Sequence, residues 1–133
     1  MDYQTLVYMM RDVADNSADV ARHVIMLGGS QLEIPENVLE LMFIAGNEAM
    51  NLYVKAVDTF FSKDVSKSVE ILRQRQEIAK LDQEIAAKAF AEKQKNEQLV
   101  CAICSVRDDI KRIADCAANI AKIAINRAFS VPT

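Results

Sequence analysis

The spacing of apolar residues in the last third of the chain most limits the folds open to it. These residues recur at alternating spacings of three and four, at Ile103, Val106, Ile110, Ile113, Ala117, Ile120 and Ala124. Such spacing places them on one stripe of an α-helix. Polar residues keep the same period on another face, at Asp108, Lys111, Asp115, Asn119, Lys122 and Asn126. The stretch therefore predicts a long helix with one packing face and one polar face.

A related pattern occurs near the start of the chain. Residues 11–25, laid over residues 111–125, keep five identities in fifteen positions. The identical pairs are Ala14/Ala114, Asp15/Asp115, Ala18/Ala118, Ala21/Ala121 and Ile25/Ile125. Other pairs keep their chemical character, among them Asp19/Asn119 and Arg22/Lys122. We predict two equivalent helices, each with an aspartate on a polar face.

Length and composition define the class of fold. A chain of 133 residues is long enough to bury a core of its own, so we expect one domain over residues 1–133. It has three glycines and two prolines, whereas sheets need turn residues at short intervals. We therefore expect an all-α fold, an antiparallel bundle of four long helices at about residues 3–27, 35–61, 64–92 and 97–129.

Several residues predict where these helices start, stop and pack. Gly28 and Gly29 suit a left-handed stop of the first helix, and Asp64 suits the N-cap of the third. In the second helix, Gly46 predicts a close approach to a neighbouring backbone, because glycine otherwise weakens a helix. We expect the second helix to pack through the stripe Leu39, Phe43, Gly46, Met50, Tyr53, Val57 and Phe60.

Charge and hydropathy exclude several classes of protein. A net charge of −3, with acidic and basic residues well mixed, gives no field that would attract nucleic acid. The start of the chain lacks the basic n-region of a secretory signal, and no apolar run is long enough to span a bilayer. The three cysteines are an odd number in helical sequence, which suits a reducing compartment. We expect a cytoplasmic protein that meets a membrane only through a partner.

The sequence also argues against catalysis. Its one histidine, His23, has no glutamate three residues before it, so a di-iron carboxylate site is excluded. Cys101 and Cys104 form a C-x-x-C pair, but Cys116 lies too far along the helix to join Cys104 at one zinc ion. We interpret these cysteines as small buried residues. No Gly-rich phosphate loop and no Ser/His/Asp set occurs, so we expect a protein that is not an enzyme.

The two aspartate helices resemble a known signature. The segments RDVADNSADVAR and KRIADCAANIAK are similar to the ERIGDxAxNIAE pattern of the PhoU family of phosphate transport regulators. Asp15 and Asp115 stand at the family's Asp, and Asp19 and Asn119 stand at its Asn. Residues 60–90 resemble the family's hairpin segment, with matches at Asp64, Glu77, Leu81, Asp82, Glu84 and Ile85. The resemblance implies the last helix of the first three-helix repeat followed by the whole second repeat.

The chain departs from the family where the family carries acids associated with metal clusters. Arg11, Lys111, Arg22 and Lys122 occupy those positions, and a cationic side chain repels a metal ion. Asp15 and Asp19 still form a D-x-x-x-D pair, which Asp12 and Asp115 would join to hold a divalent, iron or zinc cation. The alternative is that these aspartates pair with the neighbouring Arg and Lys across helices. No cofactor is certain from the sequence.

The resemblance implies a non-enzymatic regulator of phosphate uptake or phosphate signalling. Its expected partners are the ATPase subunit of a phosphate transporter or a sensor kinase. Its contact surface would be a polar face with Asp15, Asp19, Asp115 and Asn119. Two alternatives stay open: a metal-binding bundle that uses the Asp-x-x-x-Asp carboxylates, and a dimerisation module of a longer regulator. We also expect a homodimer or a higher oligomer.

Overall fold

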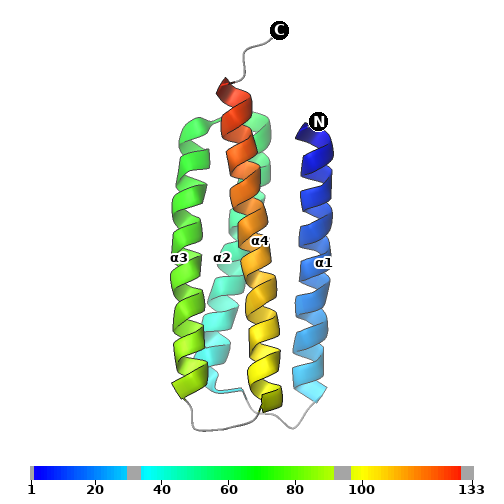
Figure 1. The fold of residues 1–133 in the computed structure, drawn as a ribbon, viewed down its shortest axis with the longest axis vertical. Coiled ribbons are helices and arrows are strands. Elements are labelled where there is room, and N and C mark those ends of the chain that lie inside the picture. Colours follow the sequence, from blue (N-terminus) through cyan, green and yellow to red (C-terminus); the bar gives the residue numbers. More distant parts are fainter. Residues whose placement is uncertain (1, 30–33, 92–96, 130–133) are drawn as a thin grey trace.

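Four long helices make up the part of the chain that the structure describes. This structure is a computed structural model, which describes residues 2–29, 34–91 and 97–129. The helices are α1 (Asp2–Gly29), α2 (Glu36–Ser62), α3 (Val65–Ala91) and α4 (Glu97–Phe129), and these described ranges contain no strand. Successive helices run in opposite directions (Figure 1). The predicted all-α bundle of four long helices is confirmed.

The fourth helix is the centre of the arrangement. Cα atoms approach within 8 Å between α4 and each other helix, and between α2 and α3. Among the described residues, no such approach links α1 to α2 or α3. Helices α2, α3 and α4 therefore form a mutually packed group, and α1 lies at the edge of the bundle beside α4 (Figure 1).

The predicted stripe of α4 supplies the core of the bundle. All of its members are 4% exposed or less, namely Ile103, Val106, Ile110, Ile113, Ala117, Ile120 and Ala124. The stripe meets Ile71, Ile78 and Ile85 of α3, and Leu6 and Val13 of α1, in one apolar cluster. Burial of these branched side chains is the main favourable term in folding.

The predicted inward face of α2 is correct at Phe60, with Tyr53 and Val57 partly buried against the core, and wrong toward the start of the helix. The core residues are Val38, Met42, Ala45, Ala49, Leu52, Ala56 and Phe60. In contrast, Leu39 and Phe43 are 51% and 72% exposed. Because α2 carries apolar residues on two adjacent faces, periodicity alone does not select the inner one. Three alanines on the buried face let this helix lie close to its neighbours.

The predictions for individual helix ends had mixed outcomes. Asp64 caps α3 as expected, because its Oδ1 accepts a hydrogen bond from the backbone N–H of Lys67 at 3.2 Å. Gly28 and Gly29 are the last two residues of α1, and the left-handed stop stays a prediction because the residues that follow lie outside the described part of the chain. The left-handed residue is Lys63, with φ 59° and ψ 29°, which ends α2. Its N–H bonds the carbonyl of Thr59 there.

The expected close approach of a backbone to Gly46 is also wrong. A Cβ built at Gly46 would meet only Ile110 Cδ1, at 3.9 Å, which is ordinary van der Waals contact. The position therefore has room for a methyl group, and nothing in its packing requires glycine.

Candidate functional site

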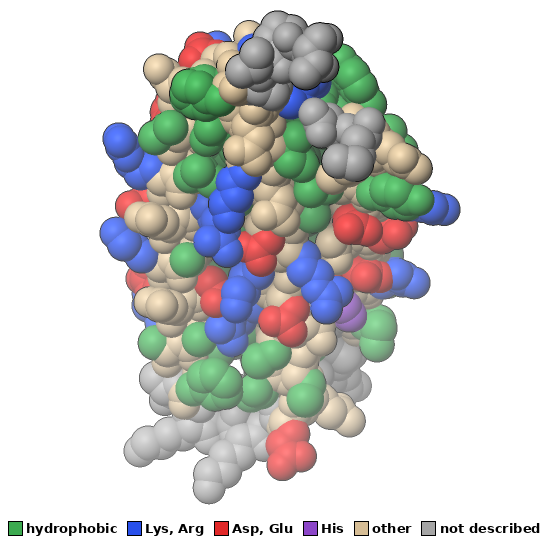
Figure 2. Space-filling model, turned by 45° about the horizontal axis from the view of Figure 1, so that its top comes forward, with side chains coloured by type: hydrophobic (Ala, Val, Ile, Leu, Met, Phe, Trp, Pro, Cys, Tyr) green, Lys and Arg blue, Asp and Glu red, His purple; other side chains and the backbone are tan. Residues whose placement is uncertain are grey.

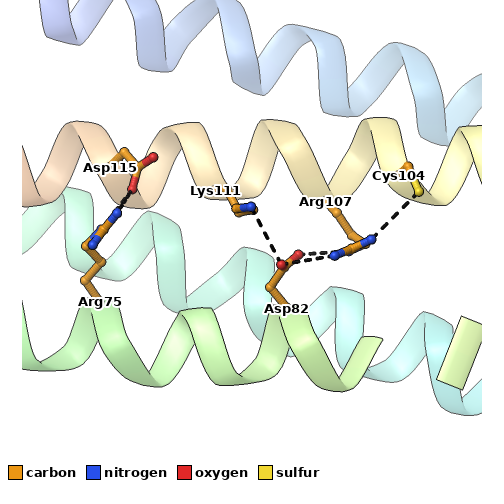
Figure 3. A network of polar contacts seen from close by, with 6 residues as sticks. All are labelled: Arg75, Asp82, Cys104, Arg107, Lys111 and Asp115. Carbon is orange, nitrogen blue, oxygen red and sulfur yellow. Dashed lines mark hydrogen bonds and ion pairs between the residues drawn. The ribbon is translucent and has the colours of Figure 1, made fainter. Parts of the chain in front are cut away.

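A cluster of charged side chains lies along the contact of α3 with α4 (Figure 3). We call it the α3–α4 seam and define it by Arg75, Asp82, Arg107, Lys111 and Asp115 (Figure 3). Arg107 donates to Asp82 twice, from Nε to Oδ1 at 2.9 Å and from Nη2 to Oδ2 at 3.1 Å. Lys111 Nζ lies 3.9 Å from the same carboxylate. One acid thus holds two cations of the facing helix.

The Asp82 to Arg107 pair is sheltered from solvent. Their side chains are 11% and 18% exposed, and the hydrogen bonds that Arg107 donates to Asp82 raise the pKa of Arg107 above its usual value. Nη1 of Arg107 also lies 3.8 Å from Cys104 Sγ. A buried ion pair of this kind fixes how the two helices meet. If the pair is broken, a charge is left buried without its partner, which is strongly destabilising.

Asp115 lies at the other end of the α3–α4 seam. It accepts a hydrogen bond from Arg75 Nε at 2.8 Å, and both side chains are about half exposed. The predicted alternative, that the aspartates form ion pairs across helices, holds for Asp115. Its partner is Arg75 of α3, however, and not one of the cations named from the sequence.

A signal in the sequence points to the α3–α4 seam. Ile71, Arg75, Ile78, Asp82 and Ile85 follow the three-and-four spacing of a single helix stripe. Two of these five positions are charged, although their neighbours in the stripe are buried. A charge in an apolar stripe needs a partner on the facing helix, which is the relation that the structure shows.

The aspartates of α1 lie apart from the α3–α4 seam. Asp12 and Asp15 are exposed. Asp19 pairs with Arg22 of the same helix, so this pair does not cross between helices as the sequence reasoning expected. Asn119 is exposed on α4.

Asp12 and Asp115 are nevertheless close enough to act on one thiol. Desolvation by burial raises the pKa of Cys116, and the negative charges of Asp12 and then Asp115 raise it further. Acids of α1 and of α4 thus both raise the pKa of Cys116. A raised pKa keeps this thiol protonated and poorly nucleophilic near neutral pH.

The second buried acid ties α1 to α4. Asp109 is 5% exposed, and its Oδ2 lies 3.1 Å from His23 Nδ1. His23 therefore has a polar partner on the facing helix. The buried partner was missed because Asp109 stands in a charged run, Arg107 to Arg112, that suggests a solvated face.

No described group of three or more His, Cys, Asp or Glu side chains is arranged to hold a metal ion. The metal site proposed at Asp12, Asp15, Asp19 and Asp115 stays a prediction. All three cysteines are free. Cys101 is exposed, which corrects its interpretation as a buried residue, and Cys104 and Cys116 are partly buried.

Charge is mixed on the surface as well as in the α3–α4 seam. On the face in Figure 2, acidic and basic side chains lie next to one another instead of forming a patch of one sign. Within the described residues, no helix has an apolar stretch of the length that a membrane crossing needs.

The fold and the α3–α4 seam define a helical bundle whose buried charges lock helices together. Comparison with protein families identifies which bundle this is. The family model described as "PhoU domain" matches residues 44–124. This range is more than half of the 133 residues, and the chain belongs to the PhoU domain family. Comparisons with curated proteins and with solved structures gave no match.

The matched range covers most of α2, all of α3 and most of α4. It therefore includes most of the three mutually packed helices and the whole α3–α4 seam. Helix α1 lies outside it, so its correspondence to the closing helix of a preceding repeat stays a prediction.

Proposed function

We propose that this chain is a non-enzymatic regulator of phosphate uptake or phosphate signalling that acts in the cytoplasm. The observation that carries the proposal is the PhoU domain match over α2, α3 and α4, because the family is one of phosphate-transport regulators. The expected partner is the ATPase subunit of a phosphate transporter or a sensor kinase. This role does not require the chain to make or break covalent bonds.

The mechanism that we propose is differential contact. A regulator shifts its partner between two states only by binding one of them more tightly. The side chains offered for this contact are exposed or half exposed polar groups on α1 and α4: Asp15, Asp19, Asp115 and Asn119. The buried Asp82 to Arg107 pair would hold α3 and α4 in register.

The test replaces the two aspartates that occupy equivalent positions. Asp15→Ala and Asp115→Ala should each abolish phosphate-dependent control of uptake in cells, with helical content unchanged by circular dichroism. Glu48→Ala is the control, because it removes an exposed carboxylate from α2. If both aspartate variants regulate normally, this face is not the contact surface. If deletion of the whole chain leaves phosphate control unchanged, the regulatory role itself is wrong.

A further inference from the structure

Two of the three cysteines lie one turn apart on α4 and have no part in the proposed regulatory role. Cys101 and Cys104 stand three residues apart in the second turn of this helix, and both thiols are free. Cys101 is exposed and Cys104 is partly buried. A structural cysteine is usually buried and inert, whereas a reactive one is partly exposed. The exposure of Cys101 therefore favours thiol chemistry at this pair.

We propose that Cys101 and Cys104 form a reversible disulfide bond by exchange with a low-molecular-weight disulfide of the glutathione class. The Cys101 thiolate attacks one sulfur of that disulfide, forms a mixed disulfide and releases one small thiol. The Cys104 thiolate then attacks Cys101 Sγ, which closes the bond and releases the second small thiol. Two electrons pass from the cysteines to the small disulfide, and the two cysteine protons end on the released thiols. This inference does not rest on the regulatory role.

The spacing of the two cysteines suits a disulfide within one turn of helix. Residues three apart on an α-helix have their Cα atoms about 5 Å apart, inside the range of roughly 4.4 to 6.8 Å that disulfides show. Their Cβ atoms, about 5 to 6 Å apart at this spacing, have to approach to about 4 Å. The second turn of α4 therefore has to tighten by only about 1 to 2 Å.

The third cysteine cannot take part in this bond within one copy. Cys116 lies twelve residues beyond Cys104, which is about 18 Å along the helix. Burial first, and then the charges of Asp12 and Asp115, raise the pKa of Cys116. Exchange needs a thiolate, so this thiol is the least suited to attack near neutral pH. It provides an unreactive thiol for comparison in the same chain.

A charged hydrogen-bond donor stands beside the partly buried thiol. Arg107 Nη1 donates toward Cys104 Sγ at 3.8 Å (Figure 3), while Nε and Nη2 of the same guanidinium hold Asp82. Reactive cysteines commonly lie next to such cations. The cation also disfavours the other use of a C-x-x-C pair, which is to bind a metal ion. Among the described residues, no third His, Cys, Asp or Glu completes a metal site.

The disulfide would act on the α3–α4 seam through Arg107. Cys101 lies nearly one turn from Cys104 toward the start of α4, whereas Arg107 lies nearly one turn toward its end. Closing the bond draws Cys104 Sγ toward Cys101 and away from the guanidinium. Arg107 then loses its third contact, and its two hydrogen bonds to Asp82 have to readjust. Thiol oxidation is thereby linked to the ion pair between α3 and α4.

The first experiment equilibrates the unmodified chain with mixtures of reduced and oxidised glutathione and then alkylates the remaining thiols. Oxidising mixtures should leave one of the three thiols open to alkylation. Trypsin should release the pair on one peptide, residues 96–107, lighter by the mass of two hydrogen atoms, with Cys116 alkylated on residues 113–122. Three free thiols in every mixture, or a disulfide that joins two copies, would overturn the proposal.

Single substitutions test the order of attack. Cys104→Ser should stop at the mixed disulfide, with glutathione on Cys101. Cys101→Ser should take up glutathione several-fold more slowly, because the remaining thiol of the pair is partly buried. Cys116→Ser is the matched control and should close the disulfide as the unmodified chain does. Circular dichroism should show that all three variants keep their helices. Faster uptake at Cys104, or no disulfide in Cys116→Ser, would contradict the assignment.

The second experiment follows the link to the α3–α4 seam by NMR. The Nε–H of Arg107 donates to Asp82, and the Nε–H of Arg75 donates to Asp115 at the other end of the seam. Closing the disulfide should shift the Arg107 Nε–H signal and leave the Arg75 signal in place, and dithiothreitol should reverse the shift. If the Arg107 signal stays in place when the disulfide is closed, the link to the seam is wrong.

Discussion

Asp82 of α3 and Arg107 of α4 meet through two parallel hydrogen bonds of 2.9 and 3.1 Å, with little of either side chain exposed. The planar guanidinium matches the carboxylate at both oxygens, which adds directional specificity to the charge attraction. The pair therefore constrains both the separation and the rotation of the two helices. It lies within the range matched to the PhoU domain family.

Removal of Asp82 should be strongly destabilising. Asp82→Ala leaves Arg107 inside the bundle without its anion, and breaking a buried pair in this way costs roughly 3 kcal/mol. We expect urea unfolding to show a loss of that size. Asp115→Ala is the control, because its pair with Arg75 is about half exposed and should contribute at most about 1 kcal/mol. If both variants lost the same free energy of unfolding, the expectation that the more buried ion pair contributes more would be wrong.

Replacement of Gly46 by alanine should stabilise the protein. A Cβ there meets only Ile110 Cδ1 at 3.9 Å, so the methyl group fits without displacing a neighbour. Alanine favours the helix by about 1 kcal/mol over glycine, partly by restricting the unfolded chain. Thermal or urea unfolding of Gly46→Ala should therefore show a gain of that order. A loss of stability would contradict the open packing around Gly46.

The sequence predicts helices better than it predicts their rotation. The prediction of the buried face of α4 is correct because this helix has one apolar face opposite a charged one. Only one rotation of the helix about its axis buries the apolar face. On α2, Leu39 and Phe43 belong to a second apolar face beside the core face. The choice between the two faces depends on which neighbours are present, and the sequence of α2 alone does not contain that information.

The same limit applies to the charged residues of the candidate site. That Asp115 faces Arg75 follows from the heights and rotations of α3 and α4, which core packing sets and local sequence does not. The sequence does place Arg75 and Asp82 in an otherwise apolar stripe. It therefore predicts that both need partners but not which partners they find.

Stability should fall at alkaline pH, partly because of Cys116. Burial first, and then the charges of Asp12 and Asp115, raise the pKa of this thiol in the folded state. Below the ordinary thiol pKa of about 8.5, the thiol is protonated in both the folded and the unfolded state, and its contribution to stability is fully present. As the pH rises toward the folded-state pKa, only the unfolded chain releases the proton, so stability decreases. Urea unfolding from neutral pH upward should show this decline, and Cys116→Ala should make it shallower. An unchanged slope would show that the thiol does not contribute.

Metal analysis should decide between the ion pairs and the metal site predicted from the sequence. Asp19 pairs with Arg22 and Asp115 pairs with Arg75, so two of the four proposed ligands already have cationic partners. A metal ion would have to displace both guanidinium groups and gather carboxylates from α1 and α4, whose nearby Arg11 and Lys111 repel it. We therefore expect elemental analysis of the purified chain to find no stoichiometric cation, and addition of chelator to leave thermal unfolding unchanged. The Asp15→Ala/Asp19→Ala double variant is the matched test, because it removes the D-x-x-x-D pair. A bound cation that this variant loses would establish the metal site and overturn the expectation.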